Sequence, residues 1–243
     1  MSKLIPEESP LRRLPQTLKP SQCLIIDGIR YSIEITELAY IRLMDTLIKI
    51  SQSNKGEVPE DSFTSTLADV WTIIDSVNRL RSLITLLPDS DKADYVQTFL
   101  DKTEKIKKLR NSIQHLHARF DKLLSLKQST WGTLSWITLD SMSPISGRIH
   151  TLVAGSILQQ YKYPIPNPVG ENFRAPLDVV VLNAHGFSIR IVDLYDDVAT
   201  FITVFQKVLV EQFKGLPHPG CEMYIVQYFK HKTNDNKKEK RSK

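Results

Sequence analysis

Four side chains that can act on a phosphodiester lie close together in the stretch KKLRNSIQHLHARF, residues 107–120. They are Arg110, Asn111, His115 and His117. Histidine titrates near neutral pH, so it can take the proton of a ribose 2′-hydroxyl or give one to a leaving oxygen. A guanidinium can bind a phosphate through two parallel hydrogen bonds and stabilise the charge that develops on its oxygens. Together these residue types can bind a phosphate and transfer protons without a metal or cofactor.

Basic residues flank these side chains, and Lys107, Lys108 and Arg119 are the candidate phosphate-binding residues. Two points stay open at this level. His117 also has a suitable spacing from the arginine, so either histidine can be the one used. Arg110 and His115 are five residues apart, about 140° on an ideal helix, so a partner helix would have to complete the site. The structural alternative is that all four polar residues form the solvated flank of a bundle helix.

The pattern Arg-Asn-x-x-x-His, read at Arg110–His115, resembles the signature of the HEPN superfamily. The stretches WTIIDSVNRLRSLI, KKLRNSIQHLHARF and WGTLSWITLD are also similar to uncharacterised bacterial HEPN-like proteins linked to abortive infection. The resemblance covers residues 60–140 best. It implies a helical bundle that binds RNA and forms a homodimer, so that two copies of the motif meet at one cleft. In the RNA cleavage that the resemblance implies, Arg110 and His115 would be catalytic, and Asn111 and His117 would support them.

The resemblance leaves two kinds of function open. One is a metal-independent endoribonuclease in a bacterial defence or toxin–antitoxin system, with a cognate antitoxin or defence protein as its partner. The other is a non-catalytic interaction or dimerisation protein, because some members of the superfamily have lost catalysis.

Apolar periodicity predicts the helices that would position the motif. A first helix begins near Gly28 and ends before the polar stretch 51–62, and a second covers residues 60–87. A third, long helix is predicted over residues 92–126. Its steps of three and four residues form one apolar seam, typical of a bundle, that consists of Ile106, Leu109, Ile113, Leu116, Phe120 and Leu123. Short connections favour antiparallel neighbours.

After residue 127 the pattern becomes typical of strands. Residues 131–140 and 147–158 read as two strands, 177–194 as a hairpin, 195–214 as a helix and 221–229 as a last strand. We therefore predict an α+β fold, in which an antiparallel, HEPN-like helical bundle is followed by a small, mostly antiparallel sheet. The expected division is an extended N-terminal arm (1–27), the bundle (28–127), a β-rich segment whose helix packs on the sheet or the bundle (128–230), and a disordered basic tail (231–243).

Composition argues against several other classes. The formal net charge is +5, and part of this excess lies in the C-terminal tail. Cys23 and Cys221 are too few for a disulfide framework. The histidines and cysteines lack the spacing of metal ligands, and the glycines form no phosphate loop. Without a signal sequence or an apolar run of roughly 20 residues, we expect a cytoplasmic protein with no membrane contact.

Overall fold

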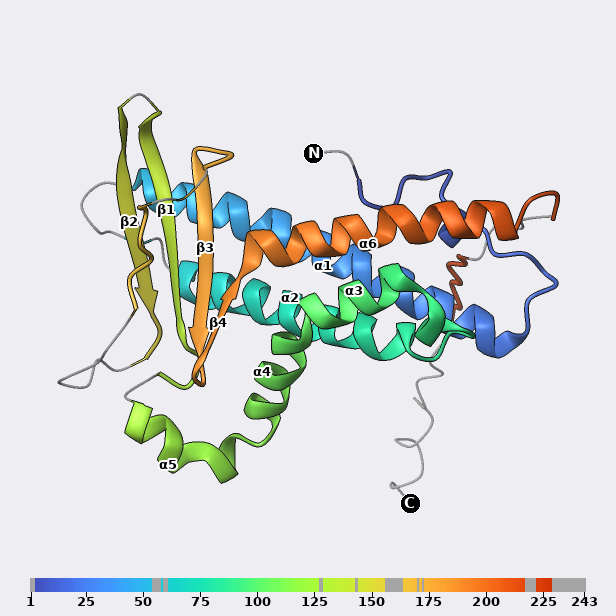
Figure 1. The fold of residues 1–243 in the computed structure, drawn as a ribbon, viewed down its shortest axis with the longest axis horizontal. Coiled ribbons are helices and arrows are strands. Elements are labelled where there is room, and N and C mark those ends of the chain that lie inside the picture. The colour runs from blue at the N-terminus through green and yellow to red at the C-terminus, as the bar shows by residue number, and fades with distance from the viewer. Residues whose placement is uncertain are drawn as a thin grey trace, which may run out of the picture.

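The computed structural model describes residues 3–53, 58, 61–126, 129–142, 144–155, 164–169, 171, 173–216 and 222–228. Over these residues the chain is a mixed α+β fold, as predicted: helices form most of the body and an antiparallel four-stranded sheet covers one end of it (Figure 1). The helices are α1 (Pro20–Gln52), α2 (Ser62–Ile84), α3 (Asp94–Lys102), α4 (Glu104–Gln114), α5 (Leu116–Leu126) and α6 (Ile191–Gln212), with short 3-10 helices η1 (Pro10–Arg12) and η3 (Ser90–Lys92). The strands are β1 (Thr133–Met142), β2 (Ile145–Val153), β3 (Leu177–Ala184) and β4 (Phe187–Arg190).

The centre of the helical body is the pair formed by α1 and α2, which run antiparallel to each other (Figure 1). Their apolar residues recur every three or four positions and meet in the core, where Ile29, Ile33, Leu43, Leu47, Val70, Ile73, Val77 and Leu80 are fully buried. α6 leaves the sheet and lies against α1 and α3. It adds Val198, Ile202 and Phe205 to the same core.

The sheet has the strand order β2-β1-β3-β4, and every neighbouring pair is antiparallel. β3 is buried along its whole length, because α6 packs against it and β1 and β4 flank it. Trp136 of β1 joins the sheet to the helices, since its indole N–H donates a hydrogen bond to the Ser51 hydroxyl at the end of α1 (2.8 Å). The sheet is therefore held at the end of the α1–α2 pair.

The single long helix predicted over residues 92–126 is wrong, because the structure breaks it at Thr103 and at His115. Arg81 of α2 causes the first break. Its guanidinium is buried and donates to the Leu100 carbonyl and to the Thr103 hydroxyl. In a continuous helix that carbonyl would accept the Glu104 N–H. The predicted seam breaks up accordingly: Ile106 and Leu109 are buried, whereas Phe120 is 54% exposed.

Both ends of the chain also differ from expectation. The predicted arm over residues 1–27 is not extended, since α1 already begins at Pro20, and Ile5, Leu11 and Leu14 pack into the main core. Proline suits this first helical position because its missing N–H has no partner within a helix. Of the predicted last strand, the described residues 222–228 form no strand. Residues 221 and 229 and the predicted tail, 231–243, lie outside the described residues.

Candidate nucleic-acid interface

α4 carries most of the candidate site residues, and these residues lie on different faces of the helix. Ile106, Leu109 and Ser112 are buried against the body. Lys107, Asn111 and His115, spaced by four residues, are exposed and follow one another along the opposite face, with Lys108 exposed beside them. We call these four residues the α4 stripe. Lysine, amide and imidazole groups are therefore available to a ligand from solvent.

Arg110 lies on a different face from the α4 stripe. Its side chain is only 26% exposed, and its Nε donates to Oδ1 of Asp75 on α2 at 3.0 Å. Asp75 also accepts a hydrogen bond from Arg79 at 2.7 Å. Burial raises the pKa of Asp75, but the hydrogen bonds from Arg79 and Arg110 outweigh it and hold that pKa below its ordinary value. The carboxylate stays ionised at neutral pH, so Arg110 fastens α4 to α2 and points away from His115.

The break at His115 decides where the two histidines lie. His115 is the C-cap of α4, and its backbone N–H donates to the carbonyls of Asn111 and Ile113. α5 begins at the next residue, and His117 is exposed in its first turn. α5 projects from the body (Figure 1). Phe120 and Leu124 on this helix are each 54% exposed. The side chain of Arg119, predicted to bind phosphate, lies outside the described side chains.

Positive charge is concentrated in the segment that contains α4 and the first half of α5. Residues 102–122 contain seven lysines and arginines and two acidic residues, a net charge of +5 that equals the formal net charge of the whole chain. Lys108 lies 3.8 Å from Glu104, but both side chains are exposed, so this ion pair contributes little and leaves the lysine free to exchange partners. This charge attracts a polyanion to α4 and α5.

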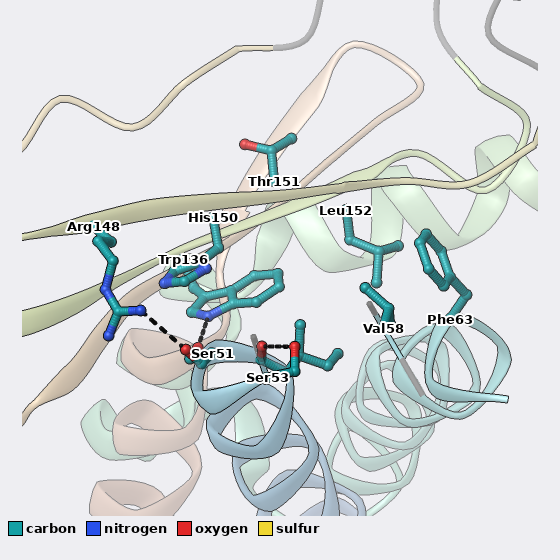
Figure 2. Close-up of a pocket in the computed structure, with 10 residues that line it drawn as sticks. Ser51, Ser53, Val58, Phe63, Trp136, Arg148, His150, Thr151 and Leu152 are labelled. Carbon is teal, nitrogen blue, oxygen red and sulfur yellow. Dashed lines mark hydrogen bonds between the residues drawn. The ribbon is translucent and has the colours of Figure 1, made fainter. Parts of the chain in front are cut away.

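A separate pocket of about 320 Å³ lies between the end of α1 and strand β2 (Figure 2). Trp136 and His150, opposite each other on β1 and β2, stack there with ring centroids 5.0 Å apart. Arg148 donates to the Ser51 carbonyl (3.1 Å) and to Asp140 (3.2 Å). This pocket could not be predicted from the sequence, because its two sides come from distant segments. Arg148 and Ser51, for example, are 97 residues apart.

His150 is the titratable ring in this pocket. Its Nε2 is 2.8 Å from the Thr138 hydroxyl. Burial and the positive charge of Arg148 lower the pKa of His150 from its ordinary value, and Asp140 opposes them only in part. The ring is therefore neutral at pH 7. Arg148 and His150 both form hydrogen bonds with other residues of the protein. Their contacts are therefore accounted for by a structural role where the sheet meets the helices.

Comparison of the chain with protein-family models, curated proteins and solved structures found no match. The resemblance to the HEPN superfamily therefore rests on the sequence motif at Arg110–His115 and the similar stretches around it alone. Within the described part of the chain, no helix has both the length and the apolar character needed to cross a bilayer. The same residues include no group of three or more histidine, cysteine, aspartate or glutamate side chains arranged to hold a metal ion.

Proposed function

We propose that this chain is a HEPN-like protein that binds RNA through the α4 stripe and the adjoining residues of α5. One observation carries the proposal: the lysines, the asparagine and the histidines in and beside the motif are exposed together on a strongly basic segment of the chain. Lysine contacts to phosphates supply most of the affinity of sequence-independent RNA binding, and they need only exposed, closely spaced cations.

Binding is better supported by this geometry than cleavage. A cleaving site needs a cation and a proton-transfer group within reach of one phosphate. Within one subunit, Arg110 is bound to Asp75 while His115 faces solvent at the end of α4. Cleavage therefore requires a homodimer in which His115 of one copy meets the cation of another. Phe120 and Leu124, one turn apart and exposed on α5, give such a dimer an apolar contact surface.

The alternative, a non-catalytic interaction protein, differs from this proposal in its partner. It would use the same dimer surface within a defence or toxin–antitoxin system and would have no affinity for RNA. The exposed charge of the α4 stripe favours RNA, because an apolar protein contact there would require the desolvation of two lysines.

One experiment separates these functions. The purified full chain is incubated with labelled structured and single-stranded RNA in EDTA, and binding and cleavage are followed separately by fluorescence anisotropy and by denaturing gels. We expect binding at low salt by the wild type. If the dimer is catalytic, both His115→Ala and Arg110→Ala should abolish cleavage, while His115→Ala, which leaves both lysines of the α4 stripe in place, should weaken binding only slightly. Binding without cleavage in all three proteins establishes a binding protein. An absence of binding to every RNA, at low salt and in a folded protein, refutes the proposal.

A further inference from the structure

An apolar groove of about 690 Å³ lies next to the region that carries the motif. Aromatic and small residues line it; the main lining residues are Phe63, Leu67 and Trp71 of α2, Trp131, Ala154 and Gly155. Trp131 is 51% exposed and Phe63 is 42% exposed. Large aromatic side chains are usually covered in a folded protein, so two of them open to solvent in one groove mark a binding surface.

The two tryptophans of the groove are held in place by the surrounding structure. Trp71 donates its indole N–H to the Trp131 carbonyl at 3.3 Å, and the two rings meet edge to face with centroids 6.2 Å apart. The buried ring of His185 packs against the edge of Trp71 and is itself within 2.9 Å of the Thr130 carbonyl. A planar ligand can therefore stack on Trp131 without first ordering the wall behind it, which lowers the entropic cost of binding.

A cluster of charged side chains lies beside the groove along α2. Phe63, Leu67, Trp71 and Asp75 succeed one another at intervals of one turn along α2, so Asp75 lies about 6 Å beyond Trp71 along the helix axis. Asp75 binds Arg79 and Arg110, and this cluster has an excess of one positive charge. α4 packs against α2 at this point and continues the positive charge through Lys107 and Lys108. An apolar aromatic surface thus adjoins a cationic one.

We propose that this groove binds unpaired bases of single-stranded RNA, while the attached phosphates lie over Arg79, Arg110 and the α4 stripe. The inference rests on the proposed RNA-binding function and specifies its substrate class. A single strand matches both surfaces because it carries a stackable ring and a negative charge in every nucleotide, and stacking on aromatic side chains is the common means of binding it. In a duplex the bases are stacked on one another, so their faces cannot reach Trp131.

The test compares three fluorescein-labelled probes of equal length by anisotropy: a single-stranded oligouridylate, the same strand without bases, and an RNA duplex. Trp131→Ala removes the exposed ring, Trp131→Phe keeps a smaller one, and Leu38→Ala removes an exposed apolar side chain of α1 as a matched control. For Trp131→Ala we expect about 10-fold weaker binding of the oligouridylate, with unchanged binding of the base-free strand and the duplex. Trp131→Phe should restore part of the loss, and Leu38→Ala should have no effect.

The outcomes separate the two proposals. If wild type binds the probes but Trp131→Ala weakens none of them, or weakens all of them equally, the groove does not hold bases and only the general RNA-binding function stands. If folded wild type binds none of the three probes, both proposals fail, and if it binds the duplex alone, the inference about the groove fails while the RNA-binding function stands. If Trp131→Ala instead changes the molar mass measured by light scattering and leaves RNA binding intact, the groove holds a second copy of the chain, which also overturns the inference.

Discussion

Removing two charges from the α4 stripe should change the salt dependence of RNA binding by a predictable amount. Lys107 and Lys108 are adjacent and exposed, and the only ion pair found for either among the described residues is the long contact of Lys108 with Glu104 at 3.8 Å. The double substitution Lys107→Gln and Lys108→Gln therefore removes two phosphate contacts with little effect on folding, since exposed ion pairs contribute little to stability.

The size of the effect follows from counterion release. For a single strand, the logarithm of the binding constant falls with the logarithm of the salt concentration by about 0.7 for each phosphate that is neutralised. The loss of two contacts should reduce the slope by about 1.4. If the two proteins bind equally at 1 M salt, the variant should bind about 25-fold more weakly at 0.1 M salt.

The assay is a titration of labelled single-stranded RNA at several salt concentrations, followed by anisotropy. The matched control is Lys207→Gln with Lys214→Gln, which removes the same charge from exposed positions on α6 and just beyond it. We expect the control to keep the wild-type slope. An equal loss in the control would show that RNA responds to the net charge of the whole protein, and it would refute the assignment of the interface to α4.

Three further predictions concern the scaffold behind the interface. Ser51→Ala removes the acceptor for the buried Trp136 indole and should lower the free energy of unfolding by about 1–2 kcal/mol in urea denaturation. Gly132→Ala should cost at least about 2 kcal/mol more than Gly215→Ala, because both glycines have positive φ but only at Gly132 would the added Cβ lie 2.6 Å from neighbouring atoms. Burial, and to a smaller extent the charge of Arg148, lower the pKa of His150 below its ordinary value of 6.5. The neutral ring therefore stabilises the fold above pH 6.5, and this contribution is lost as the pH falls below that value. The melting temperature of His150→Gln should accordingly drop less on acidification than that of the wild type.

The elements with strong local patterns could be predicted from the sequence. The apolar steps of α2 and the central part of α1, and the aromatic and β-branched residues of β1, are enough to assign each as a helix or a strand. The hairpin of β3 and β4 turns at His185 and Gly186, which both have positive φ. However, its predicted second strand was too long, since α6 begins at Ile191. Apolar runs of this length fit a buried strand or a helix equally well.

The proposed RNA-binding surface could be predicted only in part. The basic segment and its exposed histidines follow from residue type, and the structure places Lys107, Lys108, Asn111 and His115 on one face as helical spacing requires. The role of Arg110 could not be inferred, because its partner Asp75 is 35 residues away. The aromatic groove could not be inferred either, because Trp71 and Trp131 lie 60 residues apart in the sequence and meet only in the folded chain.

The sequence by itself determined the α+β class, the position of most helices and strands, and the concentration of positive charge between residues 102 and 122. These properties depend on neighbours within one turn or one strand, so local spacing is sufficient to specify them. Only the tertiary structure decided that Arg81 interrupts the third helix, that Arg110 binds Asp75, and that Trp131 opens to solvent beside Trp71. Each of these depends on which distant side chain competes for a hydrogen bond or covers a ring, and that competition is settled only when the elements pack together.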